Sequence, residues 1–182
     1  MNPHTKINQR LDNIIQELND IKSLLTQGVV KLELEPHNFR VNSDGWQKIT
    51  VDGKEYLQNP EKDIWELLEE GYRGEQLFTW GAAMRETKKA GKRMPTDEEW
   101  TALIGDEDHN NSQKEKFLNP IYCGLRLTDG TFYYLGSSQY LWSSTPSGGS
   151  NAWLRLLFST YSTVVRIADS RAYGYSVRCL RD

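Results

Sequence analysis

The chain has 182 residues, of which 37% are hydrophobic and 26% are charged, and its formal net charge is −3. This size and composition fit one globular domain with an appendage. The mild, unclustered acidity argues against a surface for nucleic acid or anionic membrane, and no apolar run is long enough to span a bilayer. The N-terminal segment also lacks an apolar stretch of the signal-peptide kind.

Residues 5–27 carry the clearest helical pattern. Apolar residues alternate three and four positions apart, as in a coiled-coil heptad repeat with Leu at a and Ile at d. This choice favours three or four strands over two, so we predict an oligomerising helix over residues 1–28 and a homotrimer, with a tetramer as second choice. An amphipathic helix lying on its own domain is the alternative. The predicted seam consists of Ile7, Leu11, Ile14, Leu18, Ile21 and Leu25.

The domain expected over residues 29–182 begins with elements of mixed type. Alternation over residues 29–39 predicts a strand, and an Asp-Gly pair within residues 48–57 predicts a β-hairpin. An Asn-Pro start predicts a helix over residues 60–70. Two more helices are expected, one from Thr79 to Gly91 and one from Thr96, where a capping box can form with Glu99.

The remainder of the chain is rich in β-forming residues. Turn signals such as Asp129-Gly130 separate strand-like segments at 121–126, 131–135, 140–142, 152–158, 162–167 and 175–181. A hairpin and helices followed by many short strands predict an α+β fold with an antiparallel sheet.

Patterns for catalysis or metal binding are sparse. Cys123 and Cys179 lack CxxC spacing, and we interpret them as small buried hydrophobic residues. The histidines, His4, His37 and His109, are scattered in polar stretches. We therefore expect no catalytic residues, no metal site and no cofactor.

The C-terminal segment lacks five residue types. Lys, Glu, Gln, Met and Trp fill 42 of the first 153 positions and none of residues 154–182. The composition of β-strands explains part of this gap, but Arg remains plentiful. The five missing types are those that no codon ending in a pyrimidine encodes. The gap is therefore typical of residues written by randomising the first two bases of AAC or AAT codons.

Three separated motifs resemble one family. The segments FTWGAAM at 78–84 and RMPTDEEW at 93–100 resemble the formylglycine-generating-enzyme branch of the C-type lectin fold. The segments GTFYYLG at 130–136 and WSST at 142–145, with the closing GYSVRCLRD, resemble the Fibrobacter succinogenes major paralogous domain. Together they cover roughly residues 46–182 and imply a C-type lectin fold.

This family includes the variable proteins of diversity-generating retroelements, in which a reverse transcriptase mutates template adenines and the copy enters the 3′ end of the gene. The resemblance implies a variable region over residues 154–173. It also implies a fixed scaffold of Trp153, Arg155, Leu157, Val164, Arg166, Arg171, Gly174 and Val177. The implied ligand-contacting positions are Leu154, Leu156, Phe158, Thr160, Tyr161, Thr163, Val165, Ile167, Ala168, Asp169, Ser170 and Tyr173.

The orientation of the strand that follows Trp153 has two interpretations. The resemblance places Leu157 inside and turns Leu154, Leu156 and Phe158 outward. Strand period alone favours the opposite arrangement, with those three side chains in the core and Arg155 in solvent.

The resemblance implies a binding protein and not an enzyme. Formylglycine-generating relatives use a pair of cysteines that bind copper, whereas neither cysteine here has another nearby in sequence, and the Trp-Asn-Asp motif of calcium-dependent lectins is absent. We expect a protein or glycan ligand on a cell surface, no nucleic-acid partner and no membrane insertion. A phage tail receptor-binding protein fits best. A bacterial variable protein of this fold and a structural paralogue without a diversified site are the alternatives.

Overall fold

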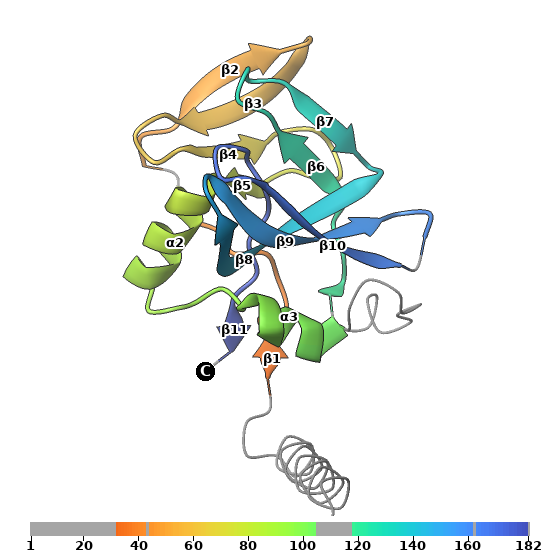
Figure 1. Ribbon diagram of the computed structural model, residues 1–182. Coiled ribbons are helices and arrows are strands. Elements are labelled where there is room, and N and C mark those ends of the chain that lie inside the picture. Colours follow the sequence, from red (N-terminus) through yellow and green to blue (C-terminus); the bar gives the residue numbers. More distant parts are fainter. Residues whose placement is uncertain (1–31, 43, 105–117, 162, 182) are drawn as a thin grey trace, which may run out of the picture. The chain divides into compact units, whose positions relative to one another are not determined.

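Strands dominate the described part of the chain. The computed structural model describes residues 32–42, 44–104, 118–161 and 163–181 (Figure 1). They form three sheets and two helices, so the predicted α+β class is confirmed. Residues 33–182 make one compact unit. The predicted oligomerising helix, including its seam from Ile7 to Leu25, lies outside the described residues.

A four-stranded antiparallel sheet has the order β2–β3–β4–β5. It consists of β2 (Gln47–Val51), β3 (Lys54–Asn59), β4 (Ile64–Leu67) and β5 (Gln76–Phe78). The predicted hairpin between β2 and β3 is confirmed. Asp52 and Gly53 have φ values of 49° and 76°, which is the left-handed backbone that a tight two-residue hairpin turn requires.

The helix predicted over residues 60–70 is wrong. The Asn-Pro start forms a turn instead, in which the backbone N–H of Lys62 donates to the carbonyl and to the side-chain oxygen of Asn59. The following residues form β4, which pairs with β3 on one side and β5 on the other. Hydrogen bonds to two neighbouring strands therefore override the local signal for a helix.

The two other predicted helices are confirmed. Helix α2 (Trp80–Lys89) begins at Thr79, whose side chain accepts a hydrogen bond from the backbone N–H of Ala82. Helix α3 (Asp97–Ile104) begins with the predicted capping box. The backbone N–H of Glu99 donates to Thr96 Oγ1 at 3.1 Å, and the N–H of Thr96 donates to Glu99 Oε2 at 2.8 Å.

The central sheet has five strands in the order β10–β9–β8–β6–β7. These are β6 (Cys123–Arg126), β7 (Phe132–Leu135), β8 (Ser138–Gly148), β9 (Asn151–Phe158) and β10 (Val164–Ser170). Neighbours are antiparallel except β6 and β8, which are parallel. Five of the predicted strands are thus confirmed. Within the described residues, the first and last predicted strands contain only β1 (Glu33–Leu34) and β11 (Leu180–Arg181), which pair with each other.

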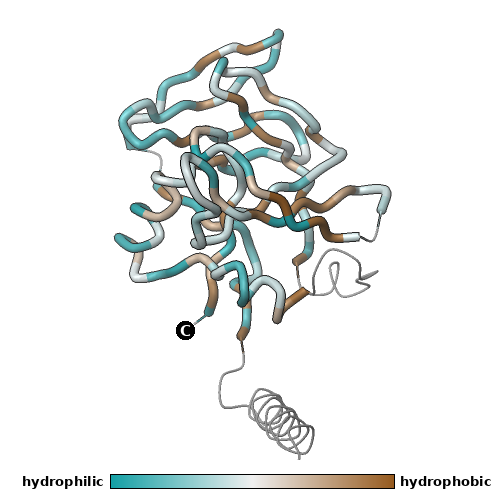
Figure 2. Tube along the Cα trace, in the orientation of Figure 1, coloured by the Kyte–Doolittle hydropathy of each residue, from teal (hydrophilic) through white to brown (hydrophobic). Residues whose placement is uncertain are grey.

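Hydrophobic side chains cover both faces of β9. The tube in Figure 2 is brown along much of β9 and β10. On one face, Leu154 belongs to the largest hydrophobic cluster, together with Phe78 and Trp142. On the other face, Leu157 packs with Trp100 of α3 in a second cluster. A strand with both faces covered has few positions left for solvent contact.

Candidate binding surface

The register of β8, β9 and β10 decides which side chains share a face. Leu156 pairs with Val165 of β10 and with Tyr140 of β8, and Leu154 pairs with Ile167 in the same way. Paired residues point to the same side of a sheet. We call this side the aromatic face, and it comprises Tyr140, Leu154, Leu156, Phe158, Val165 and Ile167, with Tyr173 and Tyr175 packed against them.

The aromatic face passes from buried to exposed along β9. Leu154 is 0% exposed and Leu156 is 8% exposed. Phe158 is half-buried, as are Val165, Ile167 and Tyr173 on the same face. Tyr161, in the β9–β10 connection, is 64% exposed, and its ring meets Phe158 edge-on with centroids 5.9 Å apart. The accessible part of this face is therefore at the β9–β10 connection and along β10.

The structure corrects the predicted orientation of β9. Leu154 and Leu156 are buried, so the expectation that they face outward is wrong. Their side chains lie in the cluster that contains Trp142 and Tyr175. The interpretation from strand period is wrong at Arg155, which is 0% exposed. Neither face of β9 meets solvent at these positions, because the cluster around Tyr175 covers one and α3 packs against the other.

The remaining predicted contact positions fall into three groups. Phe158, Thr160, Tyr161, Thr163, Val165, Ile167, Asp169 and Tyr173 are half-buried or exposed, in the β9–β10 connection, along β10 or just beyond it. Ala168 is half-buried but pairs with Trp153, on the face opposite the aromatic one. Ser170 lines a separate cleft beyond the end of β10. The structure thus brings together most, but not all, of the predicted set.

Tyrosine hydroxyls and one carboxylate add polar groups to the aromatic face. Tyr175 Oη donates to Asp169 Oδ2 at 2.7 Å. Burial, together with this carboxylate, raises the pKa of Tyr175, so its hydroxyl remains a donor. Burial likewise raises the pKa of Tyr140 to about 12. The rings of Tyr140 and Tyr175 stack with centroids 4.9 Å apart. This stacked pair forms a rigid layer beneath the exposed residues.

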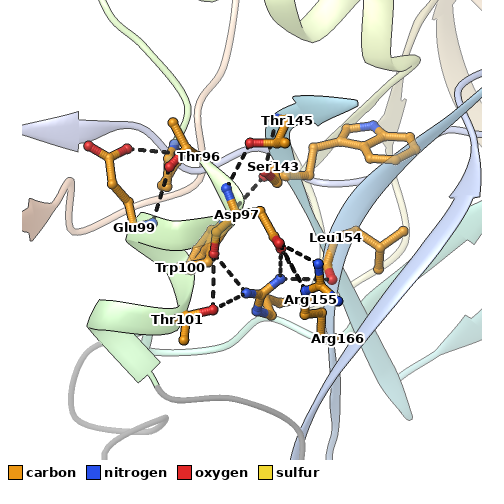
Figure 3. A network of polar contacts seen from close by, with 12 residues as sticks. Thr96, Asp97, Glu99, Trp100, Thr101, Ser143, Thr145, Leu154, Arg155 and Arg166 are labelled. Carbon is orange, nitrogen blue, oxygen red and sulfur yellow. Dashed lines mark hydrogen bonds and ion pairs between the residues drawn. The ribbon is translucent and has the colours of Figure 1, made fainter. Parts of the chain in front are cut away.

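The opposite face of β9 and β10 holds a buried ionic network (Figure 3). Asp97, the first residue of α3, accepts from Arg155 Nη1 at 2.6 Å and from Arg166 Nη2 at 2.6 Å. Arg155 also donates through Nη2 to the Asp97 carbonyl and to Thr101 Oγ1, each at 2.9 Å. The Arg166 guanidinium stacks on the ring of Trp153, with its carbon 3.4 Å from the centroid. One carboxylate therefore joins α3 to two adjacent strands.

Electrostatics keep this network charged at neutral pH. Burial alone would raise the pKa of Asp97, but hydrogen bonds from Arg166 and Arg155 outweigh that effect and lower it. The sequence suggested Arg155 and Arg166 as scaffold residues only through the family resemblance, and it did not suggest their partner. Trp153 is half-buried, and its ring supports the guanidinium of Arg166.

The side chains of both cysteines are buried, as the sequence predicted. Burial raises the pKa of Cys123 to about 12, and its Sγ lies 2.9 Å from Ser176 Oγ. A thiol with such a pKa is almost entirely protonated at neutral pH and is a poor nucleophile.

Two classes of feature are missing from the part of the chain that the structure describes. No cluster of three or more His, Cys, Asp or Glu side chains there could hold a metal ion. None of the helices in that part combines the length and the apolar character needed to cross a membrane. Comparisons of the chain with protein-family models, with curated proteins and with solved structures found no match.

Proposed function

We propose that this protein is a ligand-binding protein of the C-type lectin type, whose contact residues were diversified by adenine mutagenesis from a retroelement. One observation carries the proposal. The exposed and half-buried apolar residues of the aromatic face lie within residues 154–173, which are part of the C-terminal segment 154–182 in which every residue can be encoded by a codon ending in a pyrimidine. A patch of neighbouring exposed and half-buried apolar side chains is typical of an interaction site.

The two faces of the sheet suit this function because one face stabilises the strands and the other provides the contact residues. The Asp97 network and the second hydrophobic cluster hold β9 and β10 from one side. Side chains on the other side can then change without disturbing those contacts. The contact set is Phe158, Thr160, Tyr161, Thr163, Val165, Ile167, Asp169 and Tyr173, with Leu154 and Leu156 as the layer beneath it.

The chemistry of the contact set favours a protein or glycan ligand on a cell surface. Tyr161, Tyr173 and Phe158 offer large, rigid ring area that loses little conformational entropy on binding, as in antibody loops. Asp169 adds a carboxylate that can accept hydrogen bonds. Trimerisation through residues 1–28 would present three such surfaces and increase avidity. A receptor-binding role in a phage tail fits this arrangement, and a bacterial protein with the same kind of surface is the alternative.

Flanking DNA provides the direct test of diversification. We expect a template repeat near the gene, beside a reverse transcriptase, that reads AAC or AAT at the positions of Phe158, Val165, Ile167 and Tyr173. The scaffold codons of Arg155 and Leu157 should match between repeat and gene. Purine-ending codons at most of the four contact positions would exclude diversification.

A pair of tyrosine variants tests the location of the surface. Tyr161→Ala should change the free energy of unfolding by less than about 0.5 kcal/mol, because the side chain is largely exposed. It should weaken binding in a screen of the labelled protein against bacterial cells and a glycan array. Tyr133→Ala is the matched control, since Tyr133 is also exposed but belongs to β7. The proposed surface would be contradicted if both variants lost binding equally, or if neither variant lost binding.

Light scattering tests the proposed assembly. The full chain should have the mass of a trimer, and a chain beginning at Glu33 should have the mass of a monomer. A monomeric full-length chain would remove the helix as the assembly element. It would leave the binding surface unaffected.

A further inference from the structure

The cleft that Ser170 lines has a volume of about 620 Å³ and lies where several elements meet. Gln58 comes from β3, Thr79 precedes α2, Arg126 ends β6 and Ser170 ends β10. None of the described residues that line this cleft belongs to the aromatic face. The cleft is therefore separate from the aromatic face.

Two arginines in the cleft are stacked on tryptophans. The guanidinium carbon of Arg126 lies 3.8 Å from the centroid of Trp65, and that of Arg171 lies 4.6 Å from the centroid of Trp80. Stacking fixes the plane of a guanidinium and leaves its N–H groups directed outward along that plane. This preorganisation suits recognition of a planar carboxylate by paired hydrogen bonds.

The hydrogen-bond donors of these arginines are largely unused. The buried Nε of Arg126 has no hydrogen-bond partner among the described residues, and the same holds for the buried Nε1 of Trp65 beneath it. Arg171 donates through Nε to the carbonyl of Asn151, and its Nη groups have no partner within the described part of the chain. Because the Nε of Arg126 is itself buried, a ligand in the cleft would bind the Nη groups of the two guanidinium groups.

The backbone holds Arg126 in place without using its side chain. The N–H of Arg126 donates to the carbonyl of Gly174 at 3.0 Å, and the N–H of Gly174 donates back to Arg126 at 2.8 Å. A Cβ on Gly174 would lie 3.2 Å from Arg126 Cβ and 3.3 Å from a ring carbon of Trp65. Glycine therefore permits the close stacking of this arginine and tryptophan.

The electrostatics of the cleft favour one negative charge. Thr79 and Gly81 place the N-terminus of α2 at its wall, and the first turn of this ten-residue helix has no acidic residue. The positive end of the helix dipole therefore adds to the two guanidinium groups. Asp63 supplies a carboxylate among the described lining residues, which reduces the formal charge of the cleft to about +1.

We propose that this cleft binds the carboxylate of a polyhydroxylated ligand, such as an acidic sugar of the uronic acid type. Arg126 and Arg171 would hold the carboxylate, and the side chains of Gln58, Thr128 and Ser170 would bind ligand hydroxyl groups. A phosphate carrying two charges would be opposed by Asp63. The proposal does not depend on diversification of the aromatic face.

Titration of the full-length protein with sodium glucuronate tests the site. Calorimetry or ligand-observed NMR at pH 7 and low ionic strength should detect saturable binding, because screening is weak under these conditions. Glucose, which matches the ring but lacks the charge, should bind at least about tenfold more weakly, since charge-assisted hydrogen bonds are lost. Inorganic phosphate should also bind more weakly than glucuronate.

Three variants separate this site from general charge effects. Arg126→Gln and Arg171→Gln should each raise the Kd for glucuronate about tenfold or more. Arg40→Gln removes the same charge outside the cleft and should leave the Kd unchanged. If Arg126→Gln fails to fold, Arg171→Gln still tests the proposal, because the Arg171 side chain is only half-buried and its replacement should leave the fold intact. Absence of saturable binding, tighter binding of phosphate, or an undiminished affinity in Arg171→Gln would overturn the proposal.

Discussion

Replacing Asp97 by Asn should destabilise the protein by about 3–5 kcal/mol. Asn keeps the shape of the side chain but removes the negative charge that Arg155 and Arg166 share. The Arg155 side chain is 1% exposed, so its charge would remain buried without a carboxylate. Arg166 is 30% exposed and can be hydrated in part, so most of the loss should come from Arg155. A typical domain is stable by about 5–15 kcal/mol, and the effect should therefore be large.

Denaturation by urea, followed by tryptophan fluorescence, measures this loss as a change in the free energy of unfolding. Glu99→Gln is the matched control in the same helix turn. Glu99 pairs with Arg93, whose side chain is 50% exposed, and Gln can also complete a capping box. The control should cost less than about 1 kcal/mol. If Asp97→Asn lowers the free energy of unfolding no more than Glu99→Gln does, the network is not a major source of stability. The proposal that this face stabilises the strands while the other face binds ligand would then be wrong.

Four further outcomes are expected. The pKa of Asp97 is lowered below its ordinary value of 3.8. The stabilisation that its charge provides is therefore complete above pH 3.8 and is lost as the pH falls through the folded-state pKa. Acid unfolding of Asp97→Asn, followed by circular dichroism, should lack this loss of stability at low pH. Leu154→Ala should cost about 2–5 kcal/mol in urea denaturation, against less than about 0.5 kcal/mol for Thr160→Ala, and equal effects would contradict the burial of Leu154. Cys123 should resist a thiol reagent at pH 8 until denaturant is added, because its pKa is about 12, and rapid labelling of the native protein would be inconsistent with its burial. A chelator should leave the melting temperature unchanged, whereas a clear decrease would reveal a bound metal.

The sequence by itself determined the elements whose signals are local. The hairpin at Asp52 and Gly53, the helix that begins at Thr79 and the capping box at Thr96 all formed as predicted. Each of these signals satisfies backbone groups within a few residues, so no distant partner is required. The α+β class followed from the order of such elements along the chain. The missing residue types at the C-terminus are also a property of the sequence alone.

Only the tertiary structure decided between helix and strand after Asn59, because β3 and β5 supply the hydrogen bonds that make residues 64–67 a strand. It also decided the burial of Leu154 and Leu156, since alternation along a strand does not reveal whether one face or both faces are covered.

Contacts between distant residues were likewise beyond the reach of sequence patterns. Arg155 and Asp97 are 58 positions apart, and no spacing rule joins them. The cleft around Arg126 and Arg171 also depends on residues from several elements. These features arise when separate segments pack together. Burial and charge neutralisation then determine which side chains pair, and neighbouring residues in the chain do not.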